Sequence, residues 1–100
     1  MASQTQSIRW GAGPVAFELL SSDADVVHHA RRAFGAWQPE TEGLLGTWTV
    51  QRNGEHLDIE PRPDPPDGLE DYRACHAAQA VAMVEYAAVT RIFEIGRAHA

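Results

Sequence analysis

The sequence predicts an α+β fold: a two-layer sandwich in which a small, mainly antiparallel sheet is covered by two helices. Three observations support this prediction. Residues 47–60, TWTVQRNGEHLDIE, alternate apolar and polar residues about an Asn-Gly pair, which is typical of a β-hairpin. Residues 23–34 and 69–95 each repeat apolar residues at helical spacing. The length of 100 residues is that of a single domain, 1–100.

A polar leader, two short strands and a turn are expected before the first helix. The leader covers residues 1–7, the strands cover 7–10 and 15–21, and Gly-Ala-Gly-Pro at 11–14 forms the turn. The second strand places Val15, Phe17 and Leu19 on one face, because side chains alternate along a strand.

The first helix has a start signal and a stop signal. Ser22 is a good N-cap, and Asp25 follows three residues later as an approximate capping box. Gly35 supplies the C-terminal stop. The apolar face predicted for this helix, with steps of four, three and four, consists of Val26, Ala30, Ala33 and Trp37.

The hairpin is expected to turn at Asn53-Gly54, since a type I′ turn needs φ > 0 at both central residues. The predicted cross-strand pairs are Arg52 with Glu55, Val50 with Leu57, and Trp48 with Ile59. This register predicts one buried face and one polar face. The buried face holds Trp48, Val50, Leu57 and Ile59, and the polar face holds Thr49, Gln51, His56 and Asp58.

A spacer and a long helix complete the chain. Residues 61–68, PRPDPPDG, contain four prolines and predict an extended spacer. Asp67 as N-cap and Glu70 three residues later predict a helix over 69–95. Its apolar stripe, with steps of three, four, four and three, is Val81, Val84, Ala88, Ile92 and Ile95. Further apolar residues widen this arc, which favours burial against the sheet and leaves a homo-oligomer through this helix open.

The composition of the chain argues against two classes of partner and indicates a cellular compartment. The net charge of −6 argues against nucleic acid and anionic membranes as partners. No run approaches the roughly 18 apolar residues that span a bilayer, and the N-terminus lacks the pattern of a signal peptide. The one cysteine, Cys75, fits a reducing compartment, so we predict a cytoplasmic protein. The absence of lysine excludes Schiff-base chemistry and a Walker A lysine.

No motif for a catalytic, metal or cofactor site is present. His28 and His29 are adjacent, so on a helix they point about 100° apart and chelate one ion poorly. The chain has no C-x-x-C, H-x-x-x-H or G-x-S-x-G. We therefore predict no metal, no cofactor and no catalytic residues. A site assembled from Cys75, His56 and nearby carboxylates is the least favoured hypothesis.

Two features indicate a surface for a protein or peptide partner. Trp10 lies beside the Gly-rich turn and Trp37 lies just past a helix, so both are expected to be partly exposed, as interface anchors are. The second feature is an acidic run, comprising Asp58, Glu60, Asp64, Asp67, Glu70 and Asp71. Helix capping explains Asp67 and Glu70, and docking of a basic partner is the functional alternative. The predicted partner-binding residues are Trp10, Trp37, Asp64, Asp67, Glu70 and Asp71.

A family resemblance covers most of the chain. Its residues are IRWGAGPVAFELLSSD at 8–23, the strand at 48–50, and AVAMVEYAAVTRIFEIG at 80–96, which leads to His99-Ala100. The order of elements resembles the N-terminal region of HPr-kinase-like P-loop proteins, in particular divergent versions from gene clusters for modified peptides. The chain stops at Ala100 with no G-x-x-x-x-G-K-[ST], so no kinase residue is carried over. The resemblance implies an N-terminal accessory module used for protein contact.

Three functional hypotheses follow. The first is a non-catalytic accessory module that binds a protein or peptide. The second is a small acidic inhibitor or immunity-type protein, whose carboxylates would occlude a basic site on a partner enzyme. The third, held least, is a small enzyme using Cys75 and His56.

Overall fold

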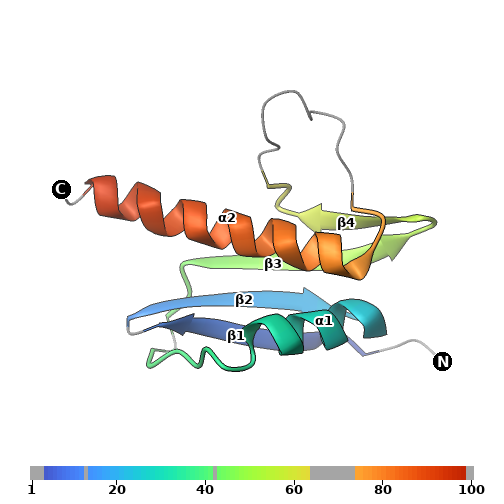
Figure 1. The fold of residues 1–100 in the computed structure, drawn as a ribbon, viewed down its shortest axis with the longest axis horizontal. Helices are drawn as coiled ribbons and strands as arrows, with labels where there is room; N and C mark the ends of the chain where they lie inside the picture. The colour runs from blue at the N-terminus through green and yellow to red at the C-terminus, as the bar shows by residue number, and fades with distance from the viewer. Residues whose placement is uncertain (1–3, 13, 42, 64–73, 99–100) are drawn as a thin grey trace.

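The computed structural model describes residues 4–12, 14–41, 43–63 and 74–98, and it shows an α+β fold (Figure 1). The elements in chain order are β1 (Gln6–Ala12), β2 (Val15–Ser21), α1 (Ala24–Phe34), β3 (Gly46–Asn53), β4 (His56–Glu60) and α2 (Ala77–Ala98). The predicted sandwich of a small sheet and two helices is therefore confirmed. β1 begins at Gln6, so the last two residues of the predicted leader belong to the strand.

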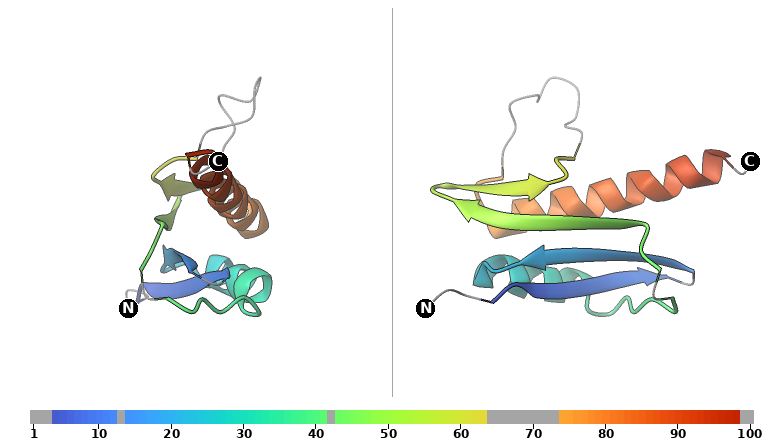
Figure 2. Two further views of the ribbon diagram at one scale, coloured as in Figure 1. Left: turned by 90° about the vertical axis from the view of Figure 1, so that its left-hand side faces the viewer. Right: turned by 180° about the vertical axis from the view of Figure 1, so that it is seen from behind.

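The four strands form one mixed sheet in the order β1-β2-β3-β4. β1 pairs antiparallel with β2, and β3 pairs antiparallel with β4. The central pair, β2 with β3, is parallel because α1 carries the chain back between them. Both helices lie on the same side of the sheet, which gives two layers (Figure 2).

One face of the sheet carries the core. Cross-strand partners such as Trp10 with Phe17, Leu19 with Trp48 and Val50 with Ile59 share this face. Its buried members are Ile8, Trp10, Phe17, Leu19, Ser21, Trp48, Val50, Leu57 and Ile59. Ser21 is polar, and its Oγ accepts a hydrogen bond from the Asp23 N–H at 3.1 Å. The predicted burial of the four hairpin residues is confirmed.

The hairpin turns one residue later than the sequence prediction. Gly54 has φ of +64°, whereas Asn53 has no positive φ, so the turn uses glycine as its first central residue. Val50 therefore pairs with Ile59, and the predicted pairing of Val50 with Leu57 is wrong. The two registers differ by two residues along β4. Because side chains repeat every two residues, this error leaves the predicted faces intact.

Helix α1 starts one residue later than predicted. Its N-cap is Asp23, whose carboxylate accepts hydrogen bonds from the N–H groups of Asp25 and Val26 at 3.1 Å, so Ser22 is not the cap. The helix ends at Gly35, as predicted. The buried residues are Val26, Val27, Ala30 and Phe34. Ala33 is exposed, so the predicted apolar face is wrong at this position, and Trp37 is exposed, as expected for a candidate partner contact.

Helix α2 starts at Ala77, eight residues after the predicted start. Ala74 is extended because its carbonyl accepts a hydrogen bond from the Leu57 N–H of β4 at 2.8 Å. The side chain of Gln79 accepts hydrogen bonds from the N–H groups of Cys75 and His76 at 3.0 and 3.1 Å, which satisfies helix-start donors. The predicted cap at Asp67 and its partner Glu70 lie outside the described residues.

An aromatic cluster joins α1 to the sheet. The rings of Trp10 and Phe34 stack with centroids 4.0 Å apart, and Trp10 also contacts Phe17 and Trp48. Trp10 is only 7% exposed, so the expectation that it lies partly at the surface is wrong. The stack explains this result, because the Trp10 ring lies between β1 and α1.

The two tryptophans outside the hairpin should differ sharply in their effect on stability. We expect Trp10→Ala to cost about 3–5 kcal/mol, the usual range for emptying a large buried aromatic site. Trp37→Ala removes a side chain that is 60% exposed and should stay within about 0.5 kcal/mol of wild type. Urea unfolding followed by circular dichroism measures both values. Equal losses for the two variants would contradict the assignment of Trp10 to the core.

Candidate functional site

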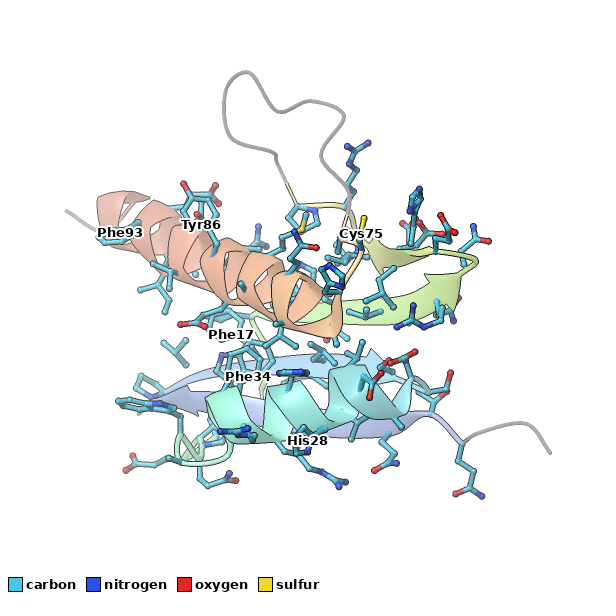
Figure 3. All side chains as sticks on the ribbon, turned by 45° about the vertical axis from the view of Figure 1, so that its right-hand side comes forward. Phe17, His28, Phe34, Cys75, Tyr86 and Phe93 are labelled. Atoms are coloured by element: carbon cyan, nitrogen blue, oxygen red, sulfur yellow. The ribbon has the colours of Figure 1, made fainter. Side chains whose placement is uncertain are left out.

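The candidate site is an apolar row on the outer side of α2, which we call the outer seam: Ala82, Tyr86, Val89 and Phe93. Tyr86 is 63% exposed, Phe93 is 64% exposed and Val89 is 43% exposed. Ala82 is also exposed. Figure 3 shows Tyr86 and Phe93 on the outer side of the helix. Large apolar side chains are thus concentrated on a single helix face.

Helical geometry places the outer seam opposite the core. Val81, Val84 and Ala88 are buried against the rest of the molecule. At 100° per residue, Val89 and Phe93 lie about 140° and 180° around the helix from Val84. The four outer seam residues step by four, three and four, which is a second apolar stripe. This spacing is visible in the sequence, which indicates the exposed side of this helix as a possible partner surface, but Tyr86, Val89 and Phe93 are not among the predicted partner-binding residues.

The predicted apolar stripe on the core side of α2, which we call the inner stripe, becomes exposed near the end of the helix. Ile92 continues the stripe of Val84 and Ala88 but is 45% exposed. The last turns of α2 extend past the end of β3 (Figure 1). The predicted burial of the stripe is therefore correct for its first three residues and wrong for Ile92, while Ile95 is half-buried. This end of the helix adds apolar surface beside the outer seam.

The outer seam carries no charge. An ion pair on α2 joins Arg91 Nη1 to Glu94 Oε2 at 3.9 Å, with both side chains more than half exposed. A pair so exposed contributes little to stability. Arg91 lies about 160° around the helix from Phe93, whereas Glu85 and Glu94 flank the outer seam. A partner on the outer seam would meet apolar side chains at the centre and carboxylates at the margin, the usual anatomy of a protein interface.

Only part of the sequence-predicted partner surface lies at the molecular surface. Trp37 is exposed in the connection from α1 to β3, and its carbonyl accepts a hydrogen bond from the Gly11 N–H at 3.0 Å. Trp10 is buried, as described above. Asp58 and Glu60 are exposed on β4. The other four predicted carboxylates, Asp64, Asp67, Glu70 and Asp71, lie outside the described residues.

The sheet face opposite the helices is polar. Ser7 Oγ donates a hydrogen bond to Glu18 Oε2 at 2.7 Å, and Asn53 Nδ2 donates one to Asp58 Oδ2 at 3.1 Å. His56 lies on this face, and its Nδ1 atom is buried without a hydrogen bond in the described part of the chain. Such a face lacks the exposed large apolar side chains of the outer seam.

The residues considered for catalysis or metal binding do not form a recognisable centre. Cys75 is an exposed thiol just before α2, whereas His56 belongs to β4. The rings of His28 and His29 lie 5.6 Å apart and edge to face. Within residues 4–12, 14–41, 43–63 and 74–98, no three His, Cys, Asp or Glu side chains are grouped to hold a metal ion.

A cleft where the parallel strands end is a second candidate, because ligands often bind at that edge of a sheet. It is lined by Ser22, Asp23, Gln51 and Arg52. Arg52 Nε donates to Asp23 Oδ2 at 2.7 Å, and Asp23 also caps α1. The two charges of the cleft therefore neutralise each other, and this ion pair joins α1 to β3.

The environment of Asp23 favours its charged form. Burial alone would raise the pKa of this carboxyl group. The hydrogen bond from Arg52 and those from backbone N–H groups outweigh burial and hold the pKa below its ordinary value of 3.8. Asp23 is thus a carboxylate near neutral pH and not a proton donor.

A search of the described residues for membrane-spanning helices and three comparisons with known proteins found no match. No helix in the described part of the chain is both long enough and apolar enough to cross a membrane. No family model, curated protein or solved structure matches the chain significantly. The resemblance to HPr-kinase-like proteins therefore stays a prediction.

The Asp23–Arg52 ion pair should make the free energy of unfolding depend on pH in the acidic range. Because folding lowers the pKa of Asp23, its carboxylate stabilises the folded state above the ordinary value of 3.8, and this contribution disappears as pH falls through the lower folded value. We expect Asp23→Asn, which keeps a capping oxygen, to be less stable than wild type at pH 7. The gap should narrow as pH falls below 3.8.

Urea unfolding midpoints of both proteins from neutral to acidic pH measure this gap. Glu55→Gln, which neutralises an exposed carboxylate in the hairpin turn, is the control and should follow the wild-type curve. A gap between wild type and Asp23→Asn that is constant across the pH range would contradict the role of the charged pair.

Proposed function

We propose that this chain is a non-catalytic, protein-binding accessory module that docks a helix of its partner on the outer seam of α2. The observation that carries the proposal is the exposure of Tyr86 and Phe93, at 63% and 64%, on the side of α2 away from the core. The partner is a protein, because the surface offers apolar side chains for packing and no charge to recognise a small ion.

The exposed area fits an interface. At about 200 Å² per aromatic side chain, Tyr86 and Phe93 together leave roughly 250 Å² uncovered. Val89 and Ile92 raise the apolar surface to roughly 400 Å², a size typical of the largest apolar patch on a monomer, which is often functional. Tyrosine and other aromatic residues are also the usual anchors of protein interfaces.

The spacing of the outer seam favours a helix as the bound element. Steps of four, three and four are those of the a and d positions of a coiled coil. A partner helix can therefore lie along Ala82, Tyr86, Val89 and Phe93 and place its own side chains between them. A strand or a loop would not match this 3.5-residue repeat.

The non-catalytic and accessory parts of the proposal have separate support. The chain has no lysine and no motif of a catalytic centre, and the Asp23 carboxylate is engaged by Arg52. The accessory role rests on the resemblance to the N-terminal region of HPr-kinase-like proteins. The one cysteine, which is exposed, supports a reducing compartment such as the cytoplasm. The acidic-inhibitor hypothesis depends mainly on residues outside the described part of the chain.

Charge on the outer seam should abolish partner binding. We expect Tyr86→Glu to retain at least tenfold less partner than wild type in copurification from the native host, because a carboxylate in an apolar interface loses its hydration. Quantitative mass spectrometry of the copurified proteins measures the loss. Trp37→Glu is the matched control, since it removes a similarly exposed aromatic residue from another element.

The test of the proposal is the difference in partner retention between Tyr86→Glu and Trp37→Glu. Equal retention of every partner by wild type, Tyr86→Glu and Trp37→Glu would contradict the proposal. Loss in Trp37→Glu alone would move the interface to the connection between α1 and β3. Circular dichroism checks that both variants fold, which we expect because both positions are exposed.

A further inference from the structure

We infer that the helix docked on the outer seam is α2 of a second copy of this chain, packed antiparallel about a two-fold axis. This inference rests on the proposed function and names the partner of that surface. The argument uses three properties of α2: the order of side-chain sizes along the outer seam, the position of its charges, and the apolar area that the seam leaves uncovered.

Side-chain sizes along the outer seam are complementary in the antiparallel direction. The sizes run small, large, medium, large from Ala82 to Phe93. In the register that places Ala82 against Phe93 of the second copy, Tyr86 meets Val89 of that copy. Each large ring therefore faces a smaller side chain, as close packing requires. A parallel pair would set ring on ring and Ala82 on Ala82, which combines overpacking with a void.

In the same register, the two α2 helices lie side by side over their whole length. Its two-fold axis crosses the helix between Ala87 and Ala88. That point is the middle of α2, which runs from Ala77 to Ala98. All 22 residues of each helix then lie beside the other copy over about 33 Å. The sheets lie on the far sides of the two helices, because the outer seam faces away from the core.

The carboxylates of the two α2 helices are not brought together in this antiparallel arrangement. Glu85 and Glu94 lie on opposite flanks of the outer seam, since nine residues rotate by about 180°. In the antiparallel register Glu85 is level with Thr90 of the second copy, and Glu94 is level with Val81 of that copy. No carboxylate of α2 is therefore level with another across the axis.

The buried area predicts a dimer that depends on concentration. The exposed apolar side chains supply roughly 400 Å² per copy, or roughly 800 Å² in the pair. This total is below the range of about 1,200–2,000 Å² for stable specific interfaces and falls in the range of weak, transient ones. Such an area fits a second copy bound reversibly.

Disulfide crosslinking tests the register directly. In the full chain carrying Cys75→Ser, we expect Ala82→Cys combined with Phe93→Cys to form a covalent dimer under mild oxidation, since the two thiols face each other across the axis. On non-reducing gels and by mass spectrometry the product should have twice the monomer mass of 11.0 kDa. The two positions on one helix are about 16 Å apart and cannot bridge internally.

Single variants are the matched controls. In the antiparallel register, Phe93 lies about 16 Å along the axis from Phe93 of the second copy, so Phe93→Cys alone should stay uncrosslinked. Ala82→Cys alone should stay uncrosslinked for the same reason. Circular dichroism confirms that the variants fold. A double variant that stays monomeric, or crosslinking through Phe93→Cys alone, would overturn the inference.

Sedimentation of the wild-type chain provides a second, independent measurement. The average mass should rise toward twice the monomer value between about 5 and 500 μM, and Tyr86→Glu should remain monomeric throughout. A wild type that stays monomeric over this range overturns the dimer. If Tyr86→Glu still lost a different protein partner in that case, the proposed function would stand while the second copy would be excluded as the partner.

Discussion

The fold depends on the stack of Trp10 against Phe34. This contact joins the edge strand β1 to α1, and Phe17 and Trp48 extend it to β2 and β3. Four elements therefore meet at one aromatic cluster. Because α1 is held over β1 and β2, it leaves the helix-side face of β3 and β4 for α2. The place of α2, and hence the direction of its outer seam, follows from where these rings pack.

The parallel pairing of β2 and β3 has a second consequence for α2. A crossover helix between parallel strands must lie on one face of the sheet, and here both helices use that face. The opposite face keeps its polar side chains, such as Glu18 and Asp58. Apart from Trp37 and Leu44 in the connection between α1 and β3, the exposed large apolar side chains of the described residues therefore lie on the helices. On α2 they do so because the helix has two apolar stripes and the sheet covers one.

The sequence predicted the fold class, the order of elements and the faces of the hairpin, because these follow from periodicity. It did not predict positions that depend on competing local groups. The N-cap moved from Ser22 to Asp23 because the Asp23 carboxylate reaches two N–H groups and Arg52. Helix α2 starts late because Ala74 pairs with β4, a long-range contact with no local signal. Trp10 was misplaced because its neighbours in sequence are turn residues, whereas its contacts come from α1 and β3.

The outer seam is a second apolar repeat on α2, in addition to the repeat that packs on the sheet. A helix that packs on one sheet needs a single apolar stripe, and Val81, Val84 and Ala88 provide it. Tyr86 and Phe93 are not part of that core, since each leaves more than three-fifths of its surface exposed. Replacing them by polar residues would leave the core unchanged. A stripe that the fold does not require, at the spacing of a helix-helix contact, is better explained by a second helix than by the stability of the monomer.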